Sequence, residues 1–237
     1  MNNPEIRVFE DQATLVRAAA EKVLAVVLAS LAKEPEVHIA LTGGRVGTMT
    51  LEALSELTVN IDLARLHIWW IDDRFVSATS NDRNELQARK AWLDQSSVPS
   101  ENIHPFPSSD DGTIESTARV FAQAFQARNP QFALVLLGMG EDGHVASLFP
   151  EGKAIAEGEW VVIEGNSPKP PAERLSLSLN ALNRASDVVF LVSGIEKAEA
   201  IRDVLSGSRR LPAARVQGKN STTWLLDQEA ASLTTSS

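Results

Sequence analysis

The chain has 237 residues, a length that one large α/β domain can use in full, and 43% of them are hydrophobic. Its formal net charge of −9 argues against nucleic acid and anionic membranes as partners. The lack of cysteine excludes disulfides and thiolate chemistry and suits a reducing compartment. Because no segment has the pattern of a signal peptide or a membrane span, we expect a cytoplasmic protein. We expect a single domain over residues 1–237, monomeric or weakly dimeric, with a flexible tail at about 232–237.

The first part of the chain predicts a helix, a strand and a second helix. Apolar side chains recur every fourth residue in Asp11 to Leu31, which predicts a helix with Asp11 as its N-cap. The apolar run Val37 to Leu41 predicts a buried strand, and a helix follows from about Thr48 to Leu57. Between them stands Thr42-Gly43-Gly44-Arg45-Val46-Gly47. A strand, a glycine turn and a helix N-terminus can bind phosphate through backbone N–H groups, although a plain tight turn explains these glycines equally well.

The next strand ends in charged side chains. Leu66 to Ile71 is apolar and leads into Asp72-Asp73-Arg74, which is either a solvated ion pair or a clamp for a substrate. Ser80-Asn81-Asp82 then predicts the cap of a helix from about Arg83 to Leu93. Asn81 therefore receives only a structural role.

A loop and a third amphipathic helix are expected after that. The loop spans Pro99 to Gly112 and contains His104, which we interpret as a packed or surface histidine rather than a catalytic one. The helix spans Thr113 to Arg128 and has Phe121 and Phe125 on one face. It leads directly into the next strand.

The most informative stretch is the one from Phe132 to Pro150. Its apolar start, Phe132 to Leu137, predicts a strand that is buried on both faces. Three glycines within six residues follow, at Gly138, Gly140 and Gly143, and Glu141, Asp142 and His144 stand among them. Open α/β sheets place ligand sites in such loops at the carboxyl ends of their strands. The alternative is a tight turn that happens to hold polar residues.

The last third is less regular. Trp160 to Ile163 predicts a strand, and Arg174 to Leu179 alternates like a half-exposed strand before a short helix at Asn180 to Asn183. Val188 to Val192 predicts another buried strand, ending at Ser193-Gly194 and followed by a helix with Lys197 in its first turn. A cation near the positive end of a helix is unfavourable unless an anion binds there, and an ordinary surface lysine is the other interpretation.

Apolar runs thus alternate with helical patterns along almost the whole chain. This alternation predicts an α/β fold with a doubly wound, mostly parallel, Rossmann-like sheet, helices on both faces, and a small accessory strand or loop region after residue 150. The runs that end at Gly43, Gly138 and Gly194 should bring their loops together along one edge of the sheet.

The stretch from Gly138 to Pro150, Gly-Met-Gly-Glu-Asp-Gly-His-Val-Ala-Ser-Leu-Phe-Pro, resembles the signature of 6-phosphogluconolactonases, whose superfamily includes glucosamine-6-phosphate deaminases. The resemblance implies that the loop at Gly43 and Gly44 cradles a substrate phosphate. It also places Arg174 and Lys197 on that phosphate, within a block typical of the family.

Four positions depart from one pattern or the other. Arg45 stands where small hydroxyl residues are usual, and Asp73 stands where glutamate is usual. Arg74 matches the lactonases, in which this arginine is expected to contact the substrate, whereas deaminases typically have tyrosine there. Phe149 occupies the position of a glutamate that deaminases need for proton transfer.

The activity that the resemblance implies is hydrolysis of 6-phospho-D-glucono-1,5-lactone to 6-phosphogluconate, the second step of the oxidative pentose phosphate pathway. His144 is the expected general base for water, and Asp142 is expected to orient it. The oxyanion donors would be backbone N–H groups of the glycine loop, with Gly140 among them, or Arg74. Arg45 and Asp72 complete the expected substrate site. Neither a metal nor an organic cofactor is expected.

Two alternatives stay open at this point. One is a glucosamine-6-phosphate deaminase, which would share the fold and the phosphate site. The other is a non-catalytic sugar-phosphate-binding domain, although Asp142 and His144 favour chemistry.

Overall fold

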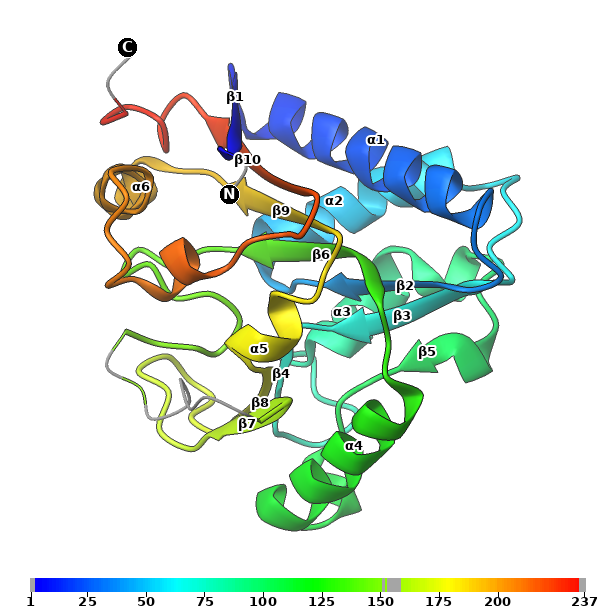
Figure 1. The fold of residues 1–237 in the computed structure, drawn as a ribbon. Helices are drawn as coiled ribbons and strands as arrows, with labels where there is room; N and C mark the ends of the chain where they lie inside the picture. Colours follow the sequence, from blue (N-terminus) through cyan, green and yellow to red (C-terminus); the bar gives the residue numbers. More distant parts are fainter. Residues whose placement is uncertain (1–2, 151, 153–158, 235–237) are drawn as a thin grey trace.

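A computed structural model describes residues 3–150, 152 and 159–234. Its main sheet has the strand order β1-β10-β9-β6-β2-β3-β5, and every neighbouring pair is parallel (Figure 1). The strands are β1 (Glu5–Phe9), β2 (Val37–Leu41), β3 (Leu66–Trp70), β5 (Ile103–His104), β6 (Phe132–Gly138), β9 (Asp187–Val192) and β10 (Ser221–Asp227). The predicted mostly parallel, doubly wound α/β sheet is confirmed.

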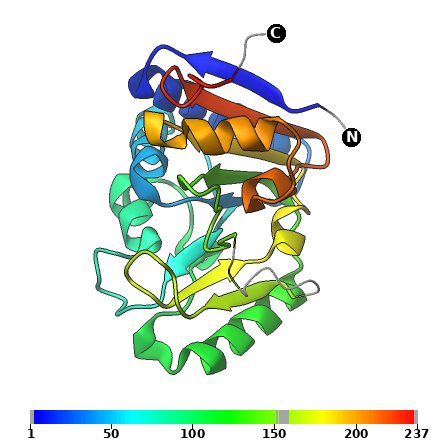
Figure 2. The ribbon, with the colours of Figure 1, turned by 90° about the vertical axis from the view of Figure 1, so that its left-hand side faces the viewer.

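Helices cover both faces of this sheet, as predicted. They are α1 (Gln12–Leu31), α2 (Gly44–Leu57), α3 (Asn84–Ala91), α4 (Ile114–Arg128), α5 (Leu179–Leu182) and α6 (Ala198–Leu205). In Figure 2, α2 and α3 lie on one side of the sheet and α5 lies on the other. Strands β2, β3 and β6 are almost completely buried between the layers, which explains why they lack polar alternation.

A second, three-stranded antiparallel sheet has the order β4-β8-β7, with β4 (Asp72–Arg74), β7 (Val161–Glu164) and β8 (Arg174–Leu177). The expected accessory region after residue 150 is therefore present, but its β4 comes from directly after β3. The prediction of a half-exposed strand at β8 was wrong, because all four residues are buried. Ser176 explains the alternation: its hydroxyl accepts a hydrogen bond from the backbone N–H of Ser147 (3.3 Å), so the polar side of β8 is inside as well.

The helix starts show which caps the sequence predicts correctly. Asp11 caps α1 through a 2.8 Å bond from the backbone N–H of Thr14, as expected. The cap expected at residues 80–82 is not made. Instead, the Asp73 carboxylate of β4 accepts the backbone N–H groups of Asn84 (2.7 Å) and Glu85 (3.3 Å). A partner distant in sequence thus replaces the local cap and ties α3 to the small sheet.

Other differences concern the ends of the chain and the loops. Strands β1, β5 and β10 were not predicted. Strand β5 has only two residues, and β1 is largely exposed at the sheet edge. Helix α2 begins at Gly44 rather than at Thr48. Of the predicted tail, residues 232–234 form a hydrogen-bonded turn, and residues 235–237 lie outside the described residues.

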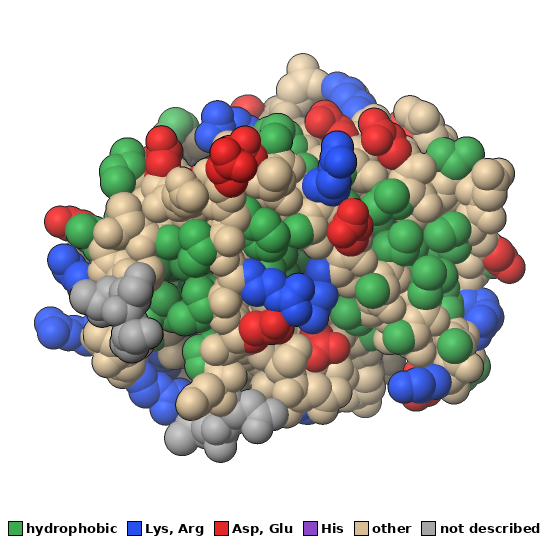
Figure 3. All heavy atoms as spheres, turned by 90° about the horizontal axis from the view of Figure 1, so that it is seen from above, with side chains coloured by type: hydrophobic (Ala, Val, Ile, Leu, Met, Phe, Trp, Pro, Cys, Tyr) green, Lys and Arg blue, Asp and Glu red, His purple; other side chains and the backbone are tan. Residues whose placement is uncertain are grey.

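The surface carries charges of both signs. Figure 3 shows acidic and basic side chains interspersed among hydrophobic ones on the face seen from above Figure 1. Within the described residues, every helix is too short or too polar to cross a membrane.

Candidate active site

A cavity of about 430 Å³ opens at the carboxyl ends of β2, β6 and β9, where β4 and β8 of the small sheet close its other wall. The predicted site residues that line this cavity are Gly43, Gly44, Arg45, Asp72, Arg74, Gly140, His144, Arg174 and Lys197. Asp142 does not line the cavity but lies behind His144. The loops after β2, β6 and β9 do meet at one edge, as expected from the glycines that follow these strands.

The imidazole of His144 is held on two sides. Its Nδ1 lies 2.5 Å from Oδ1 of Asp142, and its ring packs against Phe149 with the ring centroids 4.5 Å apart. Gly140 makes this packing possible, because a Cβ at that position would lie 2.0 Å from Nδ1 of His144. The turn is closed by Gly143, whose φ of +78° is favourable only for glycine. The expected contact between Asp142 and His144 is therefore present.

The charge state of Asp142 decides the tautomer of His144. Burial raises the pKa of this carboxyl, but the hydrogen bond and charge of His144 outweigh it and lower the pKa to about 2. A carboxylate can only accept, so Nδ1 of His144 donates and Nε2 is left as the acceptor. Because the imidazole lines the cavity, Nε2 is the nitrogen available to a ligand.

A buried polar network lies beside this histidine. The Asp72 carboxylate accepts 2.7 Å from the hydroxyl of Ser147, and the Asn84 amide donates 3.0 Å to the backbone carbonyl of Asp72. Oδ1 of Asn84 is buried without a hydrogen-bond partner among the described residues. It is also so close to Gly43 that a Cβ there would lie 1.9 Å away. The absence of a side chain at Gly43 thus lets the Gly-Gly loop contact Asn84, which in turn donates to Asp72.

Asn84 lines the cavity but was not predicted from the sequence. Asn81 was expected to have a structural role, and its side chain does accept from Nζ of Lys90 (2.7 Å). Asn84 lines the cavity instead, because Asp73 fixes the start of α3 there. The only signal in the sequence was an asparagine in the first turn of a predicted helix, where asparagine is common for structural reasons.

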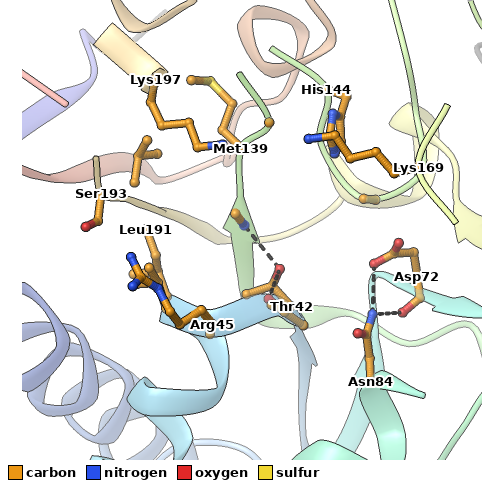
Figure 4. A pocket seen from close by; sticks show the side chains of 18 of the residues that line it. Thr42, Arg45, Asp72, Asn84, Met139, His144, Lys169, Leu191, Ser193 and Lys197 are labelled. Atoms are coloured by element: carbon orange, nitrogen blue, oxygen red, sulfur yellow. Dashed lines mark hydrogen bonds between the residues drawn. The ribbon is translucent and has the colours of Figure 1, made fainter. Parts of the chain in front are cut away.

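Cations occupy the opposite wall. Figure 4 shows Lys197 and Arg45 on one side of the pocket, with His144, Lys169 and Asp72 on the other. Lys197 is the residue that precedes α6, and its Nζ lies 3.9 Å from Oε1 of Glu196. Arg45 is exposed in the first turn of α2 and directs its guanidinium along this wall. The pocket therefore has Lys197 and Arg45 on one wall and His144 on the wall across from them.

The other two predicted arginines line the cavity but bind backbone carbonyls. Arg74 donates from Nη1 to the carbonyl of Asp82 (3.0 Å). Arg174 is buried and donates from Nη2 to the carbonyl of Lys169 (2.7 Å) and from Nε to that of Pro171 (3.1 Å). Both guanidinium groups thus have structural partners in addition to facing the pocket.

Further lining residues were not singled out from the sequence: Thr42, Val46, Gly47, Gly138, Met139, Ala146, Lys169, Pro170, Leu191, Val192, Ser193 and Glu196. Thr42 joins two strand ends, because its hydroxyl accepts 3.1 Å from the backbone N–H of Gly138. In the part of the chain that is described, His, Asp and Glu side chains form no group of three suited to a metal ion.

Comparison with known proteins places this geometry in a family. Residues 10–224 match the model of glucosamine-6-phosphate isomerases/6-phosphogluconolactonase. A 6-phosphogluconolactonase of Mycobacterium leprae is 38% identical over 238 residues, covering 95% of this chain and 96% of the relative. The crystal structure of 6-phosphogluconolactonase from Thermotoga maritima superposes with a TM-score of 0.87 at 29% identity, covering 94% of this chain and 99% of that one.

A monomeric glucosamine-6-phosphate deaminase superposes with a TM-score of 0.81, over 97% of this chain and 99% of that one. At 20% identity this likeness concerns the fold alone. On the match of the family model and the identity to the mycobacterial protein, the chain belongs to the glucosamine-6-phosphate isomerase/6-phosphogluconolactonase family.

Proposed function

We propose that this chain is a 6-phosphogluconolactonase, which hydrolyses 6-phospho-D-glucono-1,5-lactone to 6-phosphogluconate in the oxidative pentose phosphate pathway. The observation that carries this proposal is the Asp142–His144 pair, which faces a pocket whose opposite wall is cationic. The relatives that match over nearly the whole chain bear the same name. The cytoplasmic location and the monomeric or weakly dimeric state stay predictions.

The chemical step uses the free nitrogen of His144. Asp142 holds Nδ1 as a donor, so Nε2 can take a proton from water as the water oxygen attacks C1 of the lactone. The C1–O5 bond then breaks, and the same proton passes from Nε2 to the departing ring oxygen. A positioned general base of this kind typically contributes about 10²–10⁴-fold to the rate.

The phosphate binds at the cationic wall. The backbone N–H groups at the start of α2 and the side chains of Lys197 and Arg45 supply donors of positive sign. Gly44, with φ of +78°, gives the loop the shape it needs at the helix start. Arg174 adds a positive charge on the β8 side of the pocket.

Phe149 makes the deaminase alternative unfavourable. The resemblance places a proton-shuttling glutamate at this position in deaminases, and here a phenylalanine packs on the face of His144 instead. An apolar ring orients the imidazole but cannot transfer a proton. His144 is the general base that the proposed ester hydrolysis uses.

The test is a lactonase assay on freshly generated substrate, corrected for spontaneous hydrolysis. We expect His144→Gln to lower kcat by about 10²–10⁴-fold and to retain binding of 6-phosphogluconate in calorimetry. His104→Gln is the matched control, because His104 lies outside the pocket. A wild-type protein that binds the product but never exceeds the spontaneous rate would favour a sugar-phosphate-binding domain instead.

The phosphate wall is tested by comparing the phosphorylated lactone with unphosphorylated gluconolactone. Wild type should prefer the phosphorylated compound in kcat/KM, and Lys197→Ala should reduce that preference mainly by raising KM. If wild type hydrolysed both lactones with the same kcat/KM, the cationic wall would not be the phosphate site.

A further inference from the structure

The loop between β7 and β8 carries a cation, Lys169, that the proposed reaction leaves without a role. Lys169 lines the cavity on the side of His144, and Figure 4 shows its ammonium group directed into the pocket. Its Nζ lies 3.4 Å from Oε1 of Glu141, which belongs to the glycine loop of His144. Both side chains are about half exposed, at 46% and 57%. An ion pair this exposed is weak and can exchange partners readily.

The backbone of Lys169 is fixed, in contrast to its side chain. The carbonyl of Lys169 accepts from Nη2 of Arg174 (2.7 Å) and from the hydroxyl of Ser167 (2.9 Å). Its N–H donates back to the hydroxyl of Ser167 (3.2 Å). Nη2 and Nε of Arg174 also bind the carbonyls of Pro170 (3.4 Å) and Pro171 (3.1 Å). The loop therefore presents Lys169 from a rigid base and leaves its ammonium group free to move.

The carboxylates around His144 make a cation necessary at this end of the pocket. Asp72, Asp142 and Glu141 bring three carboxylates to this end of the pocket. Attack of water on the lactone puts negative charge on the carbonyl oxygen of C1, and the product keeps a carboxylate at the same place. Negative charge that develops near carboxylates is unfavourable unless a cation or strong donor faces it. Lys197 and Arg45 lie across the pocket, on the wall assigned to the phosphate. Arg74 and Arg174 also line the pocket, but each donates to backbone carbonyls.

We propose that Lys169 is the oxyanion-stabilising residue of the lactonase reaction, and that Arg174 is a positioning residue that acts through the Lys169 loop. This inference rests on the proposed function. As water adds to C1, the carbonyl π electrons move onto the C1 oxygen, and the ammonium of Lys169 leaves Glu141 to donate to that oxygen. The water proton goes to Nε2 of His144, and Lys169 stays protonated. When the C1–O5 bond breaks, the carbonyl re-forms and Lys169 faces the new carboxyl group.

This assignment separates the two lysines of the pocket by function. Lys197 should serve the ground state, because the phosphate is charged throughout the reaction. Lys169 should serve mainly the transition state, because its partner acquires charge only as water adds. Loss of Lys197 should therefore raise KM, whereas loss of Lys169 should lower kcat.

The first test is Lys169→Met, assayed on both the phosphorylated and the unphosphorylated lactone. We expect kcat to fall by about 10²-fold, as for the loss of one oxyanion donor, with KM changed by less than about threefold and the preference for phosphate unchanged. Lys169→Arg should recover part of kcat. Lys33→Met, an exposed lysine after α1, is the control and should match wild type. Melting temperatures should agree, because Lys169 is half exposed.

The second test is a double-mutant cycle with Arg174→Gln. If Arg174 acts through Lys169, the double variant should have the kcat of Lys169→Met alone, because the two losses share one cause. Additive losses in kcat would overturn the positioning role of Arg174, whatever its effect on the preference for phosphate.

The outcomes separate the two proposals. A wild-type kcat in Lys169→Met, or a loss confined to KM, would refute the oxyanion role while the lactonase activity of the wild type stands. A wild type without lactonase activity would refute the proposed function itself.

Discussion

The four histidines of this chain occupy two contrasting environments. His144 stands alone at the carboxyl edge of the sheet, with a carboxylate on one ring nitrogen and a pocket in front of the other. His38, His67 and His104 stack on one another on a face of the sheet, with centroids 4.6 and 5.4 Å apart. Strand register brings them together, because His38 pairs with His67 and His104 pairs with Trp69.

Charged side chains border this histidine stack of His38, His67 and His104. Oε1 of Glu36 lies 3.3 Å from Nε2 of His38, and Oε2 of Glu36 lies 3.5 Å from Nε2 of His67. The indole N–H of Trp69 donates to Nδ1 of His38 (3.0 Å), and Nδ1 of His67 lies 3.1 Å from Nε2 of His104. Arg128 lies 3.2 Å from Nε2 of His67. Burial comes first and neighbouring positive charges second in lowering the pKa of His104 to about 4. His144 differs from the stacked rings in two ways: its carboxylate partner lies at 2.5 Å from Nδ1, and its ring lines the cavity at the carboxyl edge of the sheet.

Asp142→Asn removes the carboxylate that binds Nδ1 of His144. The amide no longer enforces the tautomer with Nδ1 protonated, so Nε2 loses its role as acceptor in part of the molecules. We expect kcat to fall by about 10²–10³-fold with little change in melting temperature, because Asp142 is 38% exposed. A loss below threefold would show that His144 works without its carboxylate partner.

Acid should act on the histidine stack through stability. The pKa values of His38, His67 and His104 are all lowered in the folded chain, so the unfolded chain binds protons first as pH falls. Stability is therefore complete above about pH 6.5 and is lost towards pH 4. Allowing for partial exposure, we expect His104 to contribute about 2 kcal/mol of this loss. Chemical denaturation at pH 7 and pH 4.5 measures it.

A substitution at His104 tests whether the histidine stack causes this loss of stability in acid. His104→Phe keeps the stacking on Trp69 but cannot be protonated, so its stability should depend less on pH in the same range. Asp73 acts in the opposite direction, because burial raises its pKa to about 6 despite Arg83, and it stabilises the folded chain as pH falls. A pH dependence in His104→Phe equal to that of wild type would place the loss elsewhere.

Gly140→Ala should displace the ring of His144 while leaving the imidazole and its carboxylate partner in the sequence. The new Cβ would lie 2.0 Å from Nδ1 of His144 and 2.5 Å from Oδ1 of Asp142, so the pair must move. Since small misplacements of catalytic groups are costly, we expect kcat to fall about 10–100-fold. Gly165→Ala, where no atom lies within 4 Å of the new Cβ, should keep wild-type kinetics.

Phe149→Leu should have the smallest effect. It removes the ring that packs on His144 at 4.5 Å but keeps the site apolar. Aromatic contacts of this kind contribute about 0.5–1.5 kcal/mol, so we expect a two- to tenfold loss in kcat. An effect as large as that of Asp142→Asn would mean that Phe149 does more than orient the imidazole.

The sequence by itself determined the parallel sheet and nine of the residues that line the pocket. Buried strands such as Val37–Leu41 have no polar alternation, and the glycines after them stop the strands at one edge. These are local properties, because a short apolar run and a glycine turn have the same meaning in any chain with this alternation of elements. The contact between Asp142 and His144 is local too, since it spans only two residues.

Only the tertiary structure decided which polar groups bind one another across the fold. Asp73 caps α3 in place of Ser80-Asn81-Asp82, and this brings Asn84 rather than Asn81 to the pocket. Two nitrogens of Arg174 donate hydrogen bonds to backbone carbonyls of the loop that carries Lys169. Such pairings join residues from different elements, and their choice depends on distances that emerge when the two sheets pack. No periodicity along the chain carries that information, because a charged side chain has the same sequence pattern whether it faces solvent, a carbonyl or a substrate.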